Sequence, residues 1–464
     1  MNRRLTSAFA LIALIAAGCA SDKLDTVDPG DEETTSTTAA GGAGATDAKF
    51  GTLDNPCKKG DAKVADGEVG GGQTLKLGVP NDRTFSVAPG ILKEMWETSS
   101  AMVTWCNELG GFSGQQIELV DLDAAYSNVE QAMGTACGQT FAMVGGGFIN
   151  DDKMWTGKDG SDFSGCKMIE IPSWVVSPKA ASEPRVVQPI PNPPTKRPSA
   201  WLEDLGKLYP DATKKLVVVY GNTGSLKSNA EQIEAVAKGI SSPWTVGTAV
   251  DYNPLTPDFR LIASQVISQQ ATSVSWVGEP NNLAKAAEAL KSQGYEGLIF
   301  TDSNEYDPVL INAASGTAVE GIVVRSVFHP FEEADKWPAT KQFLEINKKY
   351  NVGADGEPGK YDNPLAMQSF SALLLFGTAF NVCAAKGPVT RECVLAAAKE
   401  QTAWTGGGLH AAGDPSTNSP SNCSLLIQVK DGTFTRLYPT LGSKEASDDG
   451  FSCPEPGIVE MAEQ

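Results

Sequence analysis

Three short apolar runs within residues 214–305 constrain the fold of this chain more than any other feature. The runs are 216–220, 274–277 and 298–300, and each ends in small or polar residues. Helical segments separate them. Near-continuous apolar strands that alternate with amphipathic helices are typical of a parallel sheet covered on both faces. Because ligands bind at the carboxyl edge of such sheets, we expect Asn222, Glu279 and Asp302 to emerge along one ligand-facing edge.

The length and charge of the chain restrict its class. Its 464 residues suffice for two domains with cores, and its formal net charge is -19. Such an acidic surface argues against nucleic acid and anionic membrane as partners. Only two histidines, His329 and His410, are present, and so few histidines argue against a histidine metal site. The glycines at 145–147 lack a phosphate-loop pattern, and we expect no metal and no cofactor.

Residues 1–18 have the composition of a secretory signal. Two arginines precede an apolar run, 8–17, that is too short to span a bilayer. The Ala-Ala-Gly-Cys tetrapeptide at 16–19 resembles the lipobox of bacterial lipoproteins, which implies cleavage before Cys19 and a lipid anchor on it. The alternative is an ordinary secretory signal followed by a chance cysteine. Residues 19–49 are rich in Asp, Thr and Gly and are predicted to form a flexible tether.

The cysteines indicate an oxidising compartment. The chain has nine, and setting Cys19 aside leaves eight, an even number that suits a disulfide framework. Many pairings are open to eight cysteines. We favour partners that are nearest in sequence, because each bond then ties one local unit. The predicted pairs are Cys57–Cys106, Cys137–Cys166, Cys383–Cys393 and Cys423–Cys453.

Two strand–helix series joined by a proline-rich segment indicate an α/β protein with two lobes. The prolines of 184–198 exclude a helix and favour an extended crossover, and a return crossover is expected near Phe328. The uniformly apolar segment 365–384 is predicted to be a buried helix. The predicted parts are an irregular lead-in at 50–73, lobe 1 at 74–190 and 328–415, lobe 2 at 195–327 and 420–440, and a tail at 441–464.

Together with the lipobox, this layout resembles the type 1 periplasmic binding fold. More narrowly, it resembles the solute-binding lipoproteins of branched-chain amino acid (Leu/Ile/Val) ABC transporters. Local matches are Leu77-Gly78 in the first strand, the cysteines 137 and 166, and the segment 384–387 between Cys383 and Cys393. The resemblance implies an extracytoplasmic, membrane-anchored protein without catalysis. It would capture a small polar or amphipathic ligand between its lobes and deliver it to a membrane permease.

In that family the loops after the strands bind the ligand. The candidates carried to this sequence are Asn81, Asp82, Gly147, Phe148, Ser173 and Trp174 in lobe 1, and Tyr220, Asn222, Glu279, Asp302 and Tyr306 in lobe 2. The resemblance implies that Ser173 and glycine amides hold a ligand carboxylate, while Glu279 or Asp302 faces a cationic end. Phe148 and Trp174 would enclose an apolar part. Glu279 also suits a helix start, and Asp302 also suits a turn.

Two other classes of function stay open at this level. A hydrolase with paired carboxylates would use Glu279 and Asp302, although no GxSxG elbow and no evidently free cysteine supplies a nucleophile. A lipoprotein that senses a ligand for a membrane receptor would have the same sequence features as a transport protein. A permease and an ATPase encoded nearby would separate delivery from sensing.

Overall fold

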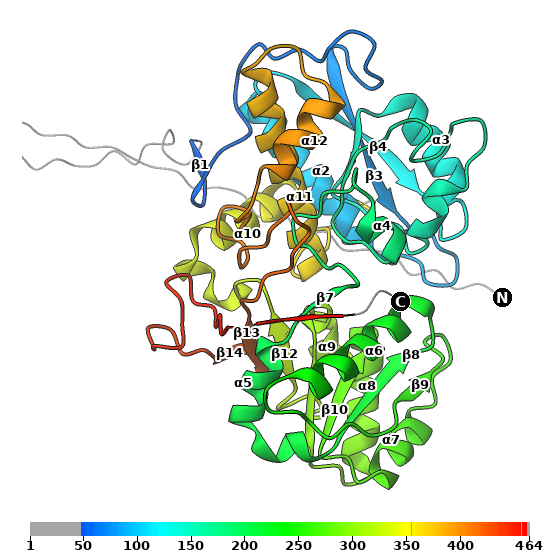
Figure 1. Cartoon of the computed structure of the whole chain (residues 1–464), viewed down its shortest axis with the longest axis vertical. Helices are drawn as coiled ribbons and strands as arrows, with labels where there is room; N and C mark the ends of the chain where they lie inside the picture. The colour runs from blue at the N-terminus through cyan, green and yellow to red at the C-terminus, as the bar shows by residue number, and fades with distance from the viewer. Residues whose placement is uncertain (1–47, 354, 456, 462–464) are drawn as a thin grey trace, which may run out of the picture. The chain divides into compact units, whose positions relative to one another are not determined.

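The computed structural model describes residues 48–353, 355–455 and 457–461 (Figure 1). The predicted signal peptide, Cys19 and the tether as far as residue 47 lie outside the described residues. Two main sheets organise the rest of the chain, and each is flanked by helices. This arrangement confirms the predicted α/β fold.

The first sheet is parallel throughout and has the strand order β4-β3-β5-β6. Its central strand, β3, is buried along most of its length, as expected for a strand covered on both faces. The last strand, β6, has only two residues. The strands are β3 (Thr74–Asn81), β4 (Gln116–Asp123), β5 (Ala142–Val144) and β6 (Glu170–Ile171).

The second sheet has the strand order β14-β13-β12-β11-β10-β8-β9. The apolar runs 216–220, 274–277 and 298–300 lie in its parallel strands β8, β10 and β11, and the parallel strands β9 and β12 flank these three. A hairpin near the end of the chain adds two antiparallel strands to the same sheet. The strands are β8 (Leu216–Gly221), β9 (Val250–Tyr252), β10 (Ser273–Val277), β11 (Leu298–Thr301), β12 (Val323–Ser326), β13 (Leu425–Lys430) and β14 (Thr433–Tyr438).

Helix α11 (Pro364–Ala384) is the core helix that the apolar segment predicted. Within the described part of the chain it alone is long and apolar enough to cross a membrane, but 72% of its apolar window is buried in the protein. The other helices are α2 (Lys93–Leu109), α3 (Val129–Gln139), α4 (Pro178–Ser182), α5 (Ala200–Leu208), α6 (Gly224–Gly239), α7 (Phe259–Ser268), α8 (Pro280–Ser292), α9 (Pro308–Asn312), α10 (Pro338–Tyr350) and α12 (Arg391–Lys399). Short 3-10 helices are η1 (Asp151–Trp155), η2 (Pro210–Lys214), η3 (Ser303–Glu305) and η4 (Phe331–Lys336).

The proline-rich crossover contains no helix between residues 184 and 198, as predicted. Its last residues form β7 (Lys196–Pro198), which pairs antiparallel with β15 (Ile458–Glu460) from the tail. In this pairing Arg197 lies opposite Val459, and the Arg197 side chain reaches Asp302, which follows β11 of the second sheet. A further small sheet near the start of the described chain joins β1 (Lys49–Phe50) to β2 (Leu53–Asp54).

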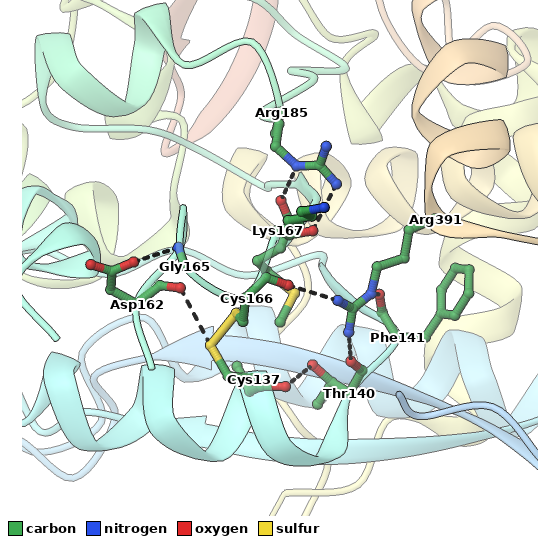
Figure 2. The surroundings of a disulfide bond; sticks show 11 residues. Cys137, Thr140, Phe141, Asp162, Gly165, Cys166, Lys167, Arg185 and Arg391 are labelled. Carbon is green, nitrogen blue, oxygen red and sulfur yellow. Dashed lines mark hydrogen bonds between the residues drawn. A yellow bond between two sulfur atoms is a disulfide. The ribbon is translucent and has the colours of Figure 1, made fainter. Parts of the chain in front are cut away.

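Four disulfides join the pairs that nearest-neighbour pairing predicted. Figure 2 shows Cys137–Cys166, which ties the end of α3 to the segment before β6. Beside it, the Arg391 guanidinium donates hydrogen bonds to the carbonyl oxygens of Thr140 (2.7 Å), Phe141 (2.7 Å) and Cys166 (3.0 Å). Because buried carbonyls need donors, Arg391 and the disulfide together fix the turn that leads into β5.

Candidate ligand-binding cleft

A cleft of about 130 Å³ lies where the loops after β6, β11 and β12 meet the proline-rich crossover. Both sheets contribute to it, since Ser173 and Trp174 follow β6 while Asp302 follows β11. The carboxyl ends of parallel strands from both sheets therefore meet here, which is where ligands bind to such sheets. Polar lining residues from the crossover and from α11 include Gln188, Asn192, Arg197 and Gln368.

Three charged side chains line the cleft, and they form one cluster, which we call the cleft triad: Arg197, Asp302 and Arg325. Arg197 Nη2 lies 2.9 Å from Asp302 Oδ2, and Arg325 Nη1 lies 2.9 Å from Asp302 Oδ1. The side chains of Arg197 and Arg325 are only 5% and 9% exposed. Arg197 also donates to Asn192 Oδ1 and Asn229 Oδ1. Two buried guanidinium groups thus share one carboxylate.

Electrostatics keep the triad charged. Burial works to raise the pKa of Asp302, but Arg325 and Arg197 outweigh it and hold that pKa at about 2. Burial lowers the pKa of Arg197, which the Asp302 charge opposes, and a guanidinium stays protonated at any physiological pH. The triad therefore carries one net positive charge. Within the described residues, the Nε atoms of both arginines are buried without a hydrogen-bond partner.

Trp174 lines both the cleft and a second space of about 120 Å³ that reaches α4 and α6. Asn192, Arg197, Asn229 and Asn304 also line both spaces, so the two spaces are neighbours. A Cβ at Gly147 would lie 2.2 Å from Trp174 Cδ1. Glycine at this position therefore makes room for the indole and does not itself line the cleft.

The comparisons with known proteins agree with this geometry. A family model for periplasmic binding proteins matches residues 177–433, more than half of the chain. This chain belongs to the periplasmic binding protein family. No curated protein sequence matches it.

Solved structures with the same fold support the assignment. A fatty acid ABC transporter substrate-binding protein from Thermomonospora curvata is 18% identical, with a TM-score of 0.64 over 86% of this chain and 97% of that one. The leucine-binding protein LivK from Thermotoga maritima is 18% identical, with a TM-score of 0.61 over 79% and 98%. LivJ from Streptococcus pneumoniae, solved with isoleucine, is 15% identical, with a TM-score of 0.59 over 79% and 100%. At these identities the likeness concerns the fold.

In this periplasmic binding protein, three of the predicted site residues line the cleft: Ser173, Trp174 and Asp302. Ser173 Oγ already donates to the carbonyl oxygen of Leu365 (3.2 Å), and its amide donates to the carbonyl of Gly146. Asp302 has two arginine partners within the protein, so the expected role of facing a ligand cation does not fit its surroundings. Trp174 is half-buried and offers an aromatic wall.

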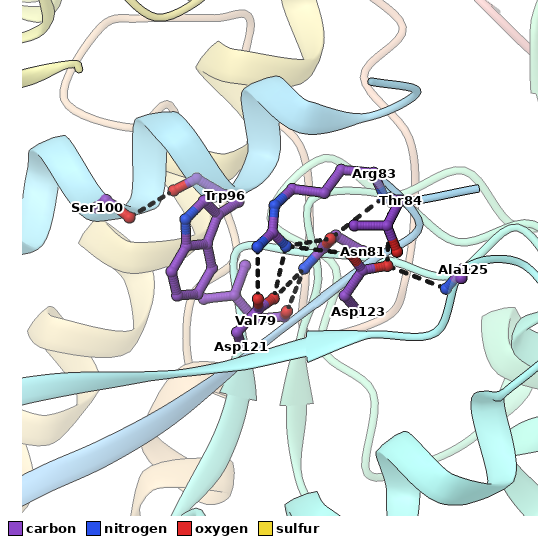
Figure 3. Close-up of polar contacts among 9 residues, drawn as sticks. All are labelled: Val79, Asn81, Arg83, Thr84, Trp96, Ser100, Asp121, Asp123 and Ala125. Carbon is purple, nitrogen blue, oxygen red and sulfur yellow. Dashed lines mark hydrogen bonds and ion pairs between the residues drawn. The ribbon is translucent and has the colours of Figure 1, made fainter. Parts of the chain in front are cut away.

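The other lobe 1 candidates hold the strand-end loops together. Asp82 is fully buried and accepts hydrogen bonds from the amides of Tyr126 (2.6 Å) and Ile149 (2.7 Å), while burial raises its pKa. Asn81 donates to Asp121 Oδ1 and accepts from Arg83. Figure 3 shows this network, in which Arg83 bridges several strand-end side chains. These residues shape the edge of the first sheet and are absent from the cleft lining.

Phe148 and the glycine amides do not have the ligand contacts that the resemblance implied for them. Phe148 is 1% exposed and packs in a core cluster with residues of β4 and α3, so it cannot enclose a ligand. The amides of Gly145 and Gly147 donate to the carbonyl oxygens of Ile171 and Pro80. These amides are therefore engaged in the protein and are not free for a ligand carboxylate, because each N–H group already has an acceptor.

The remaining lobe 2 candidates have structural partners. Glu279 directly precedes α8, as expected for the structural role of a residue at a helix start. Its carboxylate accepts hydrogen bonds from Tyr252 Oη (3.2 Å) and Asn282 Nδ2 (3.0 Å). Tyr306 is 1% exposed and donates to Glu332 Oε2 (2.6 Å). Tyr220 and Asn222 lie at the end of β8, two places from β11 in the sheet order. Among the described residues, none of these four lines the cleft.

Sequence reasoning missed the two arginines. Arg325 lies in β12, which follows the three apolar runs used to choose the lobe 2 candidates. Taking the polar residue at the end of the next apolar run, 321–325, as a further candidate would have found it. Arg197 lies among the prolines of the crossover, where no periodicity marks one face. The geometry also weakens the carboxylate-pair hydrolase. A carboxyl group with a pKa of about 2 cannot donate a proton near neutral pH, and Glu279 does not line the cleft.

Proposed function

We propose that this protein is a solute-binding lipoprotein that captures one small molecule in the cleft and delivers it, without chemistry, to the permease of an ABC transporter. One observation carries the proposal: the cleft joins strand ends of two separate sheets to a crossover, in a chain of the periplasmic binding protein family. A solute held there contacts both lobes. Its binding can then change how the lobes meet, which is a state that a permease can recognise.

The chemistry of the lining supports binding. Its charged groups are mutually paired, its neutral polar groups are amides and hydroxyls, and Trp174 supplies an aromatic wall. Polar side chains therefore lie beside the apolar Ile190 and Val327, so the lining can orient a polar group of a solute and also contact an apolar part of it. A volume of about 130 Å³ is small beside the 300–1,000 Å³ range of drug-sized pockets, so a ligand of modest size fits best. The neighbouring folds are named for a fatty acid, leucine and isoleucine, and each of these ligands carries a carboxylate.

The place of the protein follows from its N-terminal sequence and its disulfides. Four disulfides suit an oxidising compartment outside the cytoplasm. We infer that residues 1–18 are removed and that Cys19 carries the lipid anchor, because Ala16-Ala17-Gly18-Cys19 follows an apolar run. Mass spectrometry of the N-terminal peptide from membranes checks this. An acylated Cys19 is the expected result, and an unmodified terminus at another residue contradicts it.

A ligand screen with a blocked cleft tests the binding role. The body is incubated with amino acids, amides, carboxylates and small aromatics, and thermal stability is measured, because a ligand raises stability by mass action. Asn304→Trp places a large side chain at an exposed position that lines both parts of the cleft. Gln265→Trp, at an exposed position of α7 away from the cleft, is the matched control. A stabilising solute should lose its effect in Asn304→Trp alone. Product formed from any solute would contradict binding without chemistry.

A further inference from the structure

The cleft triad leaves positive charge without a partner in the protein. Asp302 is the only acidic side chain in the described lining, and it faces two guanidinium groups. Arg197 and Arg325 are both more than nine-tenths buried, so water compensates little of the excess charge. Burying an uncompensated charge is costly, and the cost is removed when an opposite charge enters the same site.

Donor capacity is also left over. A guanidinium has five N–H donors. Arg325 makes one hydrogen bond to a described residue, to Asp302 Oδ1, and its Nε is buried without a partner. Arg197 Nε is likewise without a partner, although its Nη atoms bind Asn192, Asn229 and Asp302. Both Nε atoms are buried, but Arg325 lines the cleft and uses only Nη1 toward a described residue, so its Nη groups keep donor capacity for a solute.

Among the described lining residues, no carboxylate besides Asp302 could balance the charge of a ligand ammonium. Both oxygens of Asp302 already accept from arginine, and Oδ1 also accepts from the amide and hydroxyl of Ser303. Gln368 Oε1 is a free acceptor, but it is neutral. An ammonium near the triad would meet two cations and one neutralised anion, and it would be repelled.

Given the proposed function, we infer that the cleft selects a small solute that carries a carboxylate and lacks an adjacent ammonium group. The carboxylate would bind the spare Nη donors of Arg325, beside the positive charge of Arg197, because a planar guanidinium offers a fork of donors to a carboxylate. The apolar remainder would pack on Trp174 and on Ile190 and Val327, which also line the cleft. The ligand carboxylate would thus lie near Arg197 of the crossover and Arg325 of lobe 2. It would not be held by Ser173 and the glycine amides of lobe 1, as the resemblance implied.

A matched set of three ligands tests this selection. Isocaproate, leucine and isocaproamide share one carbon skeleton and differ only in the carboxylate and the amino group. Calorimetric titration at neutral pH should give isocaproate an affinity at least about tenfold above that of the other two. Straight-chain and aromatic monocarboxylates, each with its amide and 2-amino acid, repeat the comparison for other shapes.

Substitutions at the triad locate the effect. Arg325→Gln should reduce carboxylate affinity at least about tenfold and bring the affinities of carboxylate and amide together, while Arg325→Lys should keep part of the preference because it keeps the charge. Arg83→Gln removes an arginine from the strand-end network outside the cleft and should leave the preference unchanged. Should Arg325→Gln not fold, Arg325→Lys and the ligand set on the unaltered protein still decide.

The outcomes separate this inference from the function on which it rests. A carboxylate preference that Arg325→Gln abolishes and Arg83→Gln retains supports both. If a 2-amino acid binds as well as its matched carboxylate, or if only neutral or cationic solutes bind in a way that Asn304→Trp blocks, the inference is overturned and the binding role stands. If no solute of any class binds in a way that Asn304→Trp blocks, the binding role fails and the inference fails with it.

Discussion

Two clusters of arginine and aspartate lie at strand ends in this molecule, and their charge balances are opposite. In the first, which we call the rim cluster, Arg83 pairs with Asp121 (2.6 Å) and Asp123 (3.2 Å) (Figure 3). In the second, the cleft triad, two arginines share Asp302. The rim cluster has more acid than base and its side chains are 12–35% exposed. The cleft triad has more base than acid and its arginines are buried.

The comparison teaches that composition alone does not make a binding site. Solvent can compensate the excess acid of the rim cluster, and both Nη atoms of its arginine donate to carboxylates, with Nη1 also donating to Asn81 Oδ1. The excess base of the cleft triad has neither solvent nor a protein partner for its Nε atoms within the described structure. An unbalanced cluster whose excess charge lies on buried side chains is the one that gains most from a ligand of opposite charge.

The largest expected effect is on stability, through the shared carboxylate. Asp302→Ala should lower the free energy of unfolding by about 3–5 kcal/mol, because it leaves two buried guanidinium groups without a counter-charge. Asp121→Ala, in the rim cluster, should cost no more than about 1 kcal/mol, as exposed pairs do. Urea denaturation of both variants measures the difference. Equal costs would show that burial does not distinguish the two clusters.

As the pH falls, protonation of the buried His410 should lower the free energy of unfolding before protonation of Asp302 affects the cleft triad. Burial lowers the pKa of His410 to about 4 from 6.5, against the opposing hydrogen bond to the carbonyl of Ala411. Its Nδ1–H donates to that carbonyl, so its Nε2 accepts from Ser371 Oγ (2.9 Å), and protonation would break this arrangement. Because the folded pKa lies below the unfolded one, stability is complete above pH 6.5 and falls toward pH 4, by roughly 3 kcal/mol for this group.

The same titration separates the triad from that loss. With a pKa of about 2, Asp302 keeps its charge throughout the window from pH 6.5 to 4. The difference in unfolding free energy between the unaltered protein and Asp302→Ala should therefore stay constant from pH 6.5 to about 5, above the range where the unfolded carboxyl protonates, while both values decline. Urea denaturation at several pH values tests this. His410→Gln should remove only part of the decline, because burial also lowers the pKa of His329, to about 3. A difference that shrinks above about pH 5 would contradict the assigned charge state.

An intermediate effect is expected on ligand affinity, through the aromatic wall of the cleft. Trp174→Ala should weaken binding of the solute found by screening by about 1–3 kcal/mol, because it removes apolar contact area. Trp96 is the matched residue of the rim cluster, where the Arg83 guanidinium lies 5.3 Å from its ring centroid. Trp96→Ala should leave affinity unchanged in the same calorimetric titration. If Trp174→Ala also binds as the unaltered protein does, the indole does not touch the solute.

Periodicity and turn residues were enough to predict most of the fold. The apolar runs became parallel strands, the segment 365–384 became a buried helix, and the disulfides joined neighbouring cysteines. Each of these depends on local pattern or on short separation in sequence. The pairing of β7 with β15 depends on residues more than 250 positions apart, and no local pattern announces it.

The site was less predictable, because its chemistry depends on which strand-end residues find partners. Asp82, Glu279 and Asp302 look alike in sequence, as carboxylates after strands. Asp82 accepts hydrogen bonds from two backbone amides, and Glu279 accepts from Tyr252 and Asn282. Of the three, only Asp302 pairs with arginines at the cleft. Arg197 reaches Asp302 across 105 positions of sequence. The residues of one loop cannot show its net charge at the site when the counter-charge comes from a distant segment of the chain.

The smallest expected effect concerns the rim cluster itself. Arg83→Gln should lower the free energy of unfolding by no more than about 1 kcal/mol, since water solvates Asp121 and Asp123 when the guanidinium is lost. A double-mutant cycle of Arg83→Gln with Asp121→Ala should give a coupling energy that fades toward zero in molar salt, because exposed charges are screened. The matched cycle of Arg197→Gln with Asp302→Ala should keep most of its coupling at the same salt, because solvent ions do not reach between buried groups. Coupling energies with the same dependence on salt would contradict the contrast between a solvated and a buried cluster, and with it the charge argument for the ligand.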